Sequence, residues 1–368
     1  MKIIIDNLVF EWQKAGGISV VWHELIKRMM NDCTICPHLS FVEYPHTDEN
    51  LFHKELGIGQ EAIIKNCSAT GFSWKRYLNL SIHADKKFIF HSTYYRICSN
   101  SNAINIVTVH DFTYEYFNKG IKKYIHSLTK SRAIRNADYI VCISENTKKD
   151  LIKFVPDVNK DKIYVIPNGS SDDFFVISQD RLDYYENFLL FVGSRAAYKN
   201  FDLAVQVAKQ SNLKLKIVGS VLSSSEKAFV KEQLGNNYEE LGHIDNHKLN
   251  EEYNKALALI YPSSYEGFGL PVIEAQKAGC PVVAILNSSI KEIYGALSYL
   301  SPDNKVSNLC DIVSHLRDVS GYRAHVVSLG LENASKYTWS KTYNMYKNLY
   351  LHIMQSNENI SNHSNMEQ

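Results

Sequence analysis

Two glutamates stand eight positions apart around a glycine-rich turn, in the stretch YEGFGLPVIEAQKAGCP that begins at Tyr265. Gly267 and Gly269 allow a tight turn in which the backbone can approach a ligand closely. The proline that follows suits the first turn of a helix, where its missing N–H costs nothing. Glu266 is therefore predicted to lie on a loop, and Glu274 one turn inside a helix.

The turn and the helix start predict an anion site between the two carboxylates. The first N–H groups of a helix have no intrahelical partners, and they favour a negative charge. Carboxylates on both sides of such a site can accept hydrogen bonds from hydroxyl groups. This combination suits a ligand that carries hydroxyls on both sides of a phosphate, as a nucleotide-sugar does.

A second stretch, FLLFVGSRAAYKNFDLAV, places two cations after a predicted strand. Arg195 and Lys199 follow Gly193, and an amphipathic helix is predicted to begin near Asn200. Two cations beside a helix start can hold a diphosphate without a metal ion. Taken alone they are typical of solvated surface charges, and the glutamate motif is what favours a binding role. Because the sequence has no Asp-x-Asp motif, we expect neither a metal nor another cofactor.

Composition sets the class of protein. A chain of 368 residues is too long for one ordinary core, so two domains are expected. The net charge of +1 gives no general attraction to nucleic acid. We find no apolar window long enough to span a membrane and no signal-peptide core at the start. Seven scattered cysteines are typical of reduced thiols, which favours a cytoplasmic protein.

Short apolar runs alternate with helical patterns along the whole chain, which predicts an α/β fold with parallel sheets covered on both faces. Ligands of such sheets bind beyond the carboxyl ends of the strands. The predicted strands of the first half are 2–6, 87–91, 105–111, 138–144 and 162–169. Those of the second half are 188–194, 213–220, 256–264 and 281–285.

The join between the halves is predicted near residue 172, within PNGSSDDFFVISQD. We expect one domain over residues 1–172 and a second domain over residues 173–335. A late helix is expected over residues 336–353, with Trp339, Tyr343, Tyr346 and Leu349 on one face. The polar end, 354–368, is predicted to be disordered.

Several segments together resemble family 4 of the glycosyltransferases, which are retaining enzymes with the two-domain GT-B fold. The likeness runs from about residue 1 to residue 353, and its segments follow the family's order. They are TVHDFTYEYF, ADYIVCISENTKKDL, VIPNGSSDDFF, VGSRAAYKNFDLAV, LGHIDNHKLNEEYNKALALIYPS and SSYEGFGLPVIEAQKAGCPVV. The resemblance implies two Rossmann-like domains facing a central cleft, an acceptor-side domain over residues 1–172 and a nucleotide-sugar-binding domain over residues 173–335. It also implies that the last helix crosses back to the first domain.

The resemblance also implies roles on the nucleotide side. Glu266 would lie beside the donor sugar, and Glu274 would accept hydrogen bonds from the ribose. Arg195 and Lys199 would neutralise the distal phosphate, although Ser194 stands where the family often has an arginine, which makes Lys199 the firmer assignment. The backbone of Phe268, Gly269 and Leu270 would meet that phosphate.

Three further positions come from the same resemblance. The backbone near Ile244 would touch the base of the nucleotide. Gly16 and Gly17 would form a glycine loop close to phosphate and acceptor, and His110 would hydrogen-bond the donor sugar. Without the resemblance, the histidine would be typical of a strand end and the two glycines of an ordinary loop.

The resemblance implies a metal-independent enzyme that moves a hexose from a nucleotide-sugar to a saccharide or lipid-linked acceptor. Surface polysaccharide or glycolipid assembly, such as that of lipopolysaccharide O-antigen, is the expected setting. The segments GGIS and YKNF favour mannose, and UDP-linked hexoses remain alternatives. A nucleotide-sugar epimerase of the same architecture and a non-catalytic nucleotide-sugar-binding protein are the competing interpretations.

One basic stretch leaves two interpretations open. Between Glu115 and Asp138 the chain carries six lysines and arginines and no acid, with Ile121, Tyr124, Ile125 and Leu128 at helical spacing. Such residues, together with FSWKRY upstream, suit peripheral contact with an anionic membrane, on the inner face of the plasma membrane. They equally suit an apolar stripe that faces the core, with a solvated basic face.

Overall fold

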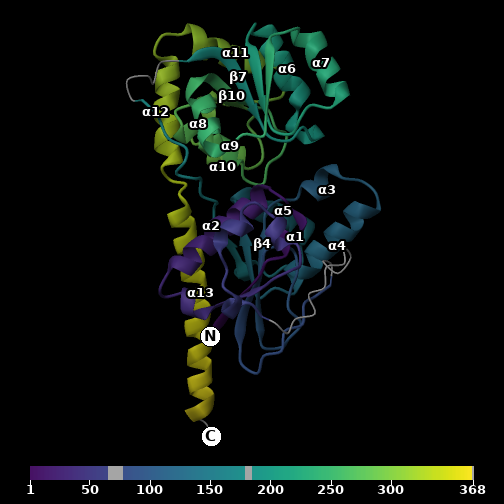
Figure 1. The fold of residues 1–368 in the computed structure, drawn as a ribbon, viewed down its shortest axis with the longest axis vertical. Helices are drawn as coiled ribbons and strands as arrows, with labels where there is room; N and C mark the ends of the chain where they lie inside the picture. The colour runs from purple at the N-terminus through teal and green to yellow at the C-terminus, as the bar shows by residue number, and fades with distance from the viewer. Residues whose placement is uncertain (65–77, 179–184, 367–368) are drawn as a thin grey trace. The chain divides into compact units, whose positions relative to one another are not determined.

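The apolar runs of the sequence become parallel strands buried on both faces. The computed structural model describes residues 1–64, 78–178 and 185–366. The chain divides into two units, Met1–Asn168 with Trp339–Gln368, and Gly169–Thr338 (Figure 1). Each unit contains one fully parallel sheet with helices on it, so the predicted α/β architecture is confirmed.

The first unit carries six strands in the spatial order β2-β1-β3-β4-β5-β6. Their bounds are β1 Lys2–Asp6, β2 Leu39–Val42, β3 Phe88–Ser92, β4 Ala103–Val109, β5 Tyr139–Cys142 and β6 Ile163–Val165. The helices are α1 Leu8–Trp12, α2 Gly17–Asn31, α3 Thr113–Phe117, α4 Ile121–Arg135, α5 Glu145–Phe154 and α13 Trp339–Met366.

The second unit carries five strands in the order β11-β10-β7-β8-β9. They are β7 Glu186–Val192, β8 Lys214–Val218, β9 Tyr238–Gly242, β10 Ala256–Tyr261 and β11 Val282–Ala284. The helices are α6 Phe201–Gln210, α7 Ser224–Leu234, α8 Asn246–Lys255, α9 Leu270–Lys277, α10 Ile290–Ile293, α11 Val306–Asp318 and α12 Tyr322–Ala334.

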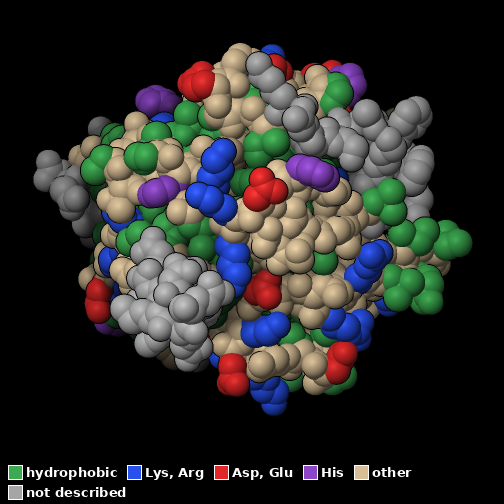
Figure 2. Space-filling view, turned by 90° about the horizontal axis from the view of Figure 1, so that it is seen from below, with side chains coloured by type: hydrophobic (Ala, Val, Ile, Leu, Met, Phe, Trp, Pro, Cys, Tyr) green, Lys and Arg blue, Asp and Glu red, His purple; other side chains and the backbone are tan. Residues whose placement is uncertain are grey.

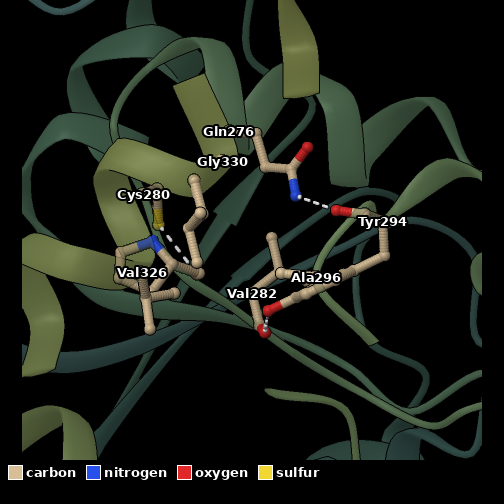
Figure 3. Close-up of a pocket in the computed structure, with 9 residues that line it drawn as sticks. Gln276, Cys280, Val282, Tyr294, Ala296, Val326 and Gly330 are labelled. Atoms are coloured by element: carbon tan, nitrogen blue, oxygen red, sulfur yellow. Dashed lines mark hydrogen bonds between the residues drawn. The ribbon is translucent and has the colours of Figure 1, made fainter. Parts of the chain in front are cut away.

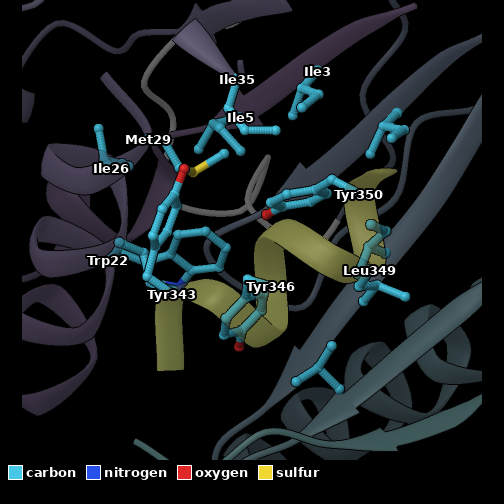
Figure 4. Close-up of a cluster of buried hydrophobic side chains, with 14 of the residues drawn as sticks. Ile3, Ile5, Trp22, Ile26, Met29, Ile35, Tyr343, Tyr346, Leu349 and Tyr350 are labelled. Atoms are coloured by element: carbon cyan, nitrogen blue, oxygen red, sulfur yellow. The ribbon is translucent and has the colours of Figure 1, made fainter. Parts of the chain in front are cut away.

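The last helix contributes an aromatic face to the core of the first unit. Tyr343, Tyr346 and Tyr350 of α13 pack in one cluster with Trp22 of α2 and Ile3 of β1 (Figure 4). The helix is longer than the sequence led us to expect, because it continues past residue 353 to Met366. Residues 339–366 contain neither glycine nor proline, the two residues that most disfavour a helix. The polar composition after residue 353 was therefore not sufficient to end the helix.

The predicted apolar stripe of α4 does not face the core. Ile121, Tyr124, Ile125 and Leu128 are all exposed, so the core-facing interpretation is wrong. The segment FSWKRY, residues 72–77, lies outside the described residues. Within the ranges that the structure describes, no helix is long and apolar enough to cross a membrane. Figure 2 shows one face of the molecule on which basic and acidic side chains are interspersed.

A buried histidine connects α13 to the sheet of the first unit. His91 on β3 lies 2.8 Å from the Tyr350 hydroxyl through Nδ1 and 2.9 Å from Thr108 Oγ1 through Nε2. Burial lowers the pKa of His91 to about 3, so its ring is neutral at pH 7. One ring nitrogen then donates and the other accepts, and both are satisfied.

Replacing Tyr350 by phenylalanine should leave His91 Nδ1 buried without its partner. We expect Tyr350→Phe to lower the free energy of unfolding by about 1–2 kcal/mol, measured by urea denaturation. Tyr124→Phe, which removes an exposed hydroxyl, is the control and should change it by less than about 0.5 kcal/mol. Equal effects of the two substitutions would contradict a structural role for the His91–Tyr350 bond.

Candidate active site

The two sequence motifs of the second unit meet because their strands are neighbours. β7 pairs with β10 in the sheet, so the loops that follow their carboxyl ends lie side by side. Lys199 Nζ lies 2.6 Å from Glu266 Oε1 and 3.2 Å from the hydroxyl of Tyr261, the last residue of β10. The predicted cation and carboxylate therefore form a direct ion pair.

The backbone of the two loops is also tied together. Asn200, in the left-handed conformation with φ 50°, donates from Nδ2 to the carbonyl of Pro262 at 2.8 Å and to Ser264 Oγ at 2.7 Å. The N–H of Ser264 returns a bond of 2.7 Å to the carbonyl of Tyr198. These bonds hold Lys199 at one place relative to the glutamate loop.

The ion pair is largely withdrawn from water. The side chains of Lys199 and Glu266 are 14% and 10% exposed. Burial raises the pKa of Tyr261 well above its ordinary value, so its hydroxyl stays neutral beside the pair. An ammonium has three donors, and contacts among the described residues use two of them, to Glu266 and Tyr261. The third can serve an anionic ligand.

Two serines from the loop before α10 shape the glutamate turn. Ser288 Oγ accepts the N–H of Glu266 at 2.9 Å, and Ser289 Oγ donates to the carbonyls of Glu266 and Phe268 at 3.0 and 2.7 Å. Ser288 has a φ of 36°, a conformation that serine rarely adopts. The two serine hydroxyls, one of them on a residue with a strained backbone, thus fix the conformation of the glutamate turn.

The glutamate turn ends at the start of α9. Gly269 is the N-cap residue, with a φ of 109°, and within the described part of the chain no side chain caps the N–H groups of Leu270 and its successors. A Cβ at Gly269 would lie 3.0 Å from the Cδ1 atoms of Ile290 and Ile293. Both the backbone conformation and this close approach require glycine, and the uncapped amides form an anion-binding end.

Glu274 lies one turn into α9, as predicted, in a far less polar environment than Glu266. Its nearest described hydrogen-bond partner is the hydroxyl of Tyr253, 3.5 Å from Oε2. Burial raises the pKa of Glu274 to about 7. Its carboxylate therefore gains most from an incoming ligand that donates hydrogen bonds.

The structure does not bring Arg195 together with Lys199. Its Nε donates to Glu226 Oε1 at 2.8 Å and its Nη2 to the carbonyl of Val221 at 2.9 Å. Glu226 belongs to the capping box at the start of α7. Arg195 Nη1 is buried without a hydrogen-bond partner among the residues that the structure describes. The guanidinium thus retains one donor nitrogen that no described residue uses.

His110 follows β4 in the first unit and is buried there. Burial lowers its pKa to about 4, so the ring is neutral at pH 7. Its backbone N–H donates to the Tyr95 hydroxyl at 3.4 Å, whereas no described residue hydrogen-bonds its Nε2. A buried polar atom without a partner is costly, and a ligand hydroxyl could satisfy it.

The remaining predicted residues lie at element ends. Gly16 is the N-cap of α2, and within the described ranges no side chain caps this helix. A Cβ at Gly17 would meet nothing within 4 Å, so its own surroundings do not demand glycine. Ile244 lies half-buried between β9 and α8, next to the N-cap residue Asp245.

Neither the cavity found in the second unit nor a metal cluster offers an alternative site among the described residues. A cavity of about 10 Å³ lies between α9 and α12, lined by Gln276, Cys280, Tyr294 and Gly330 among others (Figure 3). It has room for about one water molecule and none for a nucleotide. Within the described residues, no group of three or more histidines, cysteines and acids lies close enough to hold a metal ion.

Sequence reasoning missed Tyr261, Asn200, Ser288 and Ser289. Tyr261 and Asn200 adjoin the motifs, at a strand end and directly after the lysine, so position alone could have found them. The two serines carried no local signal, because they reach the turn from a loop 22 positions along the chain.

Two protein-family models match the chain. One, described as "Glycosyl transferases group 1", matches residues 172–318. The other, described as "Glycosyltransferase Family 4", matches residues 15–174. Together they cover both units and include the Lys199, Glu266 and His110 segments.

Proteins of similar sequence include glycosyltransferases. The O-antigen chain mannosyltransferase B of Escherichia coli is 35% identical over 112 residues, which is 29% of this chain and 29% of that protein. The uncharacterized glycosyltransferase MJ1178 of Methanocaldococcus jannaschii is 24% identical over 93% of this chain and 95% of its own length. Anabaena Alr3699/HepE, solved with UDP-glucose, has a TM-score of 0.69 at 14% identity, over 95% of this chain and 99% of that one.

The raised pKa of Glu274 makes a testable contribution to stability. As the pH rises from 4.5 through about 7, the unfolded carboxyl ionises before the folded one, so stability is lost. Glu274→Gln removes this loss. When the pH is raised from 4 to 8, the free energy of unfolding of the variant should rise by about 3 kcal/mol relative to that of the wild type, measured by urea unfolding. Glu232→Gln, at an exposed position on α7, is the control, and a parallel gain in both variants would contradict the assignment.

Proposed function

Because this chain belongs to family 4 of the glycosyltransferases, we propose that it moves a hexose from a nucleotide-sugar to a saccharide or lipid-linked saccharide acceptor. The transfer needs no metal ion and retains the anomeric configuration. The proposal rests on the ion pair of 2.6 Å between Lys199 and Glu266. Glu266 lies on the turn that leads into the uncapped start of α9.

The second unit is proposed to hold the nucleoside diphosphate. Its distal phosphate lies against the N–H groups of Gly269 and Leu270, and the third donor of Lys199 offsets the charge that develops on the leaving group. The ribose hydroxyls donate to Glu274, whose half-buried carboxylate otherwise has one long hydrogen bond. The unused nitrogen of Arg195 is available to the same anion.

Glu266 is proposed to act beside the donor sugar. Its pairing with Lys199 orients the carboxylate, so it can bind a ring hydroxyl and stabilise positive charge at the reacting carbon. The acceptor hydroxyl then bonds to the anomeric carbon on the face from which the nucleoside diphosphate leaves, and the hydroxyl proton passes to an oxygen of that leaving group. In the first unit, the neutral ring of His110 is proposed to hydrogen-bond a sugar hydroxyl, which would satisfy Nε2.

Mannose is the proposed sugar, and surface polysaccharide of the O-antigen kind is the proposed product. The 35% identity to an O-antigen mannosyltransferase supports this, over 29% of the chain. The fold neighbour solved with UDP-glucose supports the nucleotide-sugar donor class and leaves UDP-linked hexoses as the alternative.

Nucleotide binding can be tested without knowing the acceptor. We expect one of UDP, GDP, ADP and dTDP, each in excess EDTA, to raise the melting temperature of the purified protein. A ligand at 100 times its dissociation constant adds about 2.7 kcal/mol. GDP is expected if the sugar is mannose. A shift that appears only when Mg²⁺ replaces EDTA would contradict a metal-independent site.

Two substitutions separate phosphate binding from catalysis. Lys199→Ala should weaken nucleoside diphosphate binding, because a cation is lost. Glu266→Gln should bind the diphosphate at least as tightly, because a nearby negative charge is gone, yet lower sugar transfer about a thousandfold. Both effects are measured by titration calorimetry and by release of the nucleoside diphosphate.

A matched control exists on the same sheet. Lys214 and Glu239 form an exposed ion pair at 2.8 Å, so Lys214→Ala and Glu239→Gln should change neither binding nor transfer. Nucleotide binding without any turnover by the wild type would favour a binding protein. Conversion of the nucleotide-sugar to a stereoisomer without an acceptor would favour an epimerase.

A further inference from the structure

Ser288 has a strained backbone and directly contacts the candidate active site. Its φ of 36° lies in the left-handed region, which residues other than glycine and asparagine seldom adopt. Besides the glycines, the described residues with positive φ are Asn200, Asn212 and Ser288, so Ser288 is the one among them whose side chain does not suit this conformation. Strain of this kind persists where the surrounding structure imposes it, and it often marks a functional position.

The neighbours of Ser288 are fixed on both sides. β11 pairs with β10 in the sheet, so the loop that follows β11 lies beside the turn that carries Glu266. On one side of Ser288, Asn287 Nδ2 donates to the carbonyl of Ser263 at 2.7 Å. On the other side, Ser289 is the N-cap residue of α10. Ser288 connects these two fixed points, which explains why its backbone is held in an unfavourable conformation.

Glu266 is held at three points by residues from two other loops. Its N–H donates to Ser288 Oγ at 2.9 Å, and its carbonyl accepts from Ser289 Oγ at 3.0 Å. Its carboxylate pairs with Lys199 at 2.6 Å. Because both backbone groups of Glu266 are bonded, the direction of its Cα–Cβ bond is set. Without the bond to Ser288, the backbone on the N-terminal side of Glu266 could turn and carry the carboxylate with it.

The hydroxyl distinguishes Ser288 from the residue that its backbone favours. Glycine would adopt a φ of 36° without strain, but it could not accept the N–H of Glu266. The hydroxyl of Ser288 also donates to Asn287 Oδ1 at 3.1 Å. Because its hydrogen is used there, the oxygen is presented to Glu266 as an acceptor. The position thus combines an unfavourable backbone with a specific side-chain bond to the site.

We propose that Ser288 is a positioning residue for sugar transfer: its hydroxyl sets the backbone of Glu266 and thereby directs the carboxylate toward the donor sugar. This role rests on the proposed function, because it requires that Glu266 acts beside that sugar. Ser288 has no part in holding the diphosphate, which is proposed to contact Lys199 and the start of α9. Substitutions of Ser288 should therefore lower kcat and leave nucleotide affinity largely unchanged.

Alanine and glycine at position 288 separate the hydrogen bond from the strain. Ser288→Ala and Ser288→Gly both remove the hydroxyl, but only glycine also removes the strain. GDP-mannose, or UDP-glucose if UDP is the nucleotide that binds, serves as the donor probe. The kcat for release of the nucleoside diphosphate should fall at least about tenfold in both variants, because a reacting group is misplaced. The dissociation constant of the nucleoside diphosphate, measured by calorimetry, should change by less than about twofold.

The stability of the two variants should differ although their activities do not. Ser288→Gly should have a higher melting temperature than Ser288→Ala, because alanine keeps the strained φ. If Ser288 had a structural role only, activity would follow stability, and the glycine variant would be the more active of the two.

A matched control lies at the opposite edge of the same sheet. Asn212 also has a positive φ, 52°, and it is exposed two residues before the start of β8, whereas the candidate site follows the carboxyl ends of the strands. Asn212→Ala should melt at a lower temperature than Asn212→Gly for the same reason. Both should keep the kcat of the wild type.

The outcomes separate this role from the proposed function. Equal loss of kcat in two Ser288 variants of unequal stability supports the positioning role. Wild-type kcat in Ser288→Gly, or a kcat that follows the melting temperature, overturns it. A wild type that releases no nucleoside diphosphate from either donor probe would overturn the proposed function itself.

Discussion

The pairing of β7 with β10 is the constraint on which the candidate site depends. Parallel strands bring their carboxyl ends to one edge of a sheet, and the adjacency of these two strands converts Lys199 and Glu266, 67 positions apart, into an ion pair of 2.6 Å. Tyr261 and Asn200 then complete the attachment of one loop to the other. The chemistry of the site follows from this adjacency, because neither loop alone carries both charges.

Burial gives the candidate polar groups of the two units different properties. Glu266 forms an ion pair with Lys199, whereas no described cation bonds to Glu274, and burial raises the pKa of Glu274 to about 7. His110 is kept neutral by a pKa lowered to about 4. A carboxylate paired with a lysine, a carboxylate that gains from added donors, and a neutral imidazole whose Nε2 has no described partner are suited to different tasks.

Buried polar bonds also determine the orientation of helix α4 in the first unit. Glu115 bonds Lys130 and Ser127 inside the protein, whereas Ile121, Tyr124 and Leu128 of the same helix are exposed. A buried ion pair is expensive to break and specific in its geometry, so it can decide the orientation of a helix against the hydrophobic preference of its residues. Lys130 also donates to the carbonyl of Asp111, 3.0 Å away, which ties α4 to the loop that carries His110.

The sequence by itself determined the described strands other than β2 and β9, their parallel arrangement and the loop and helix positions of Glu266 and Glu274, because these depend on local periodicity and on glycine and proline. It also placed Lys199 after a strand that proved to neighbour β10. Tertiary structure alone decided that Arg195 bonds Glu226, 31 positions away, and that Ser288 and Ser289 support the glutamate turn. It likewise decided which side of α4 is buried. Periodicity shows which residues share a face, but only the groups packed against a helix determine whether that face is covered.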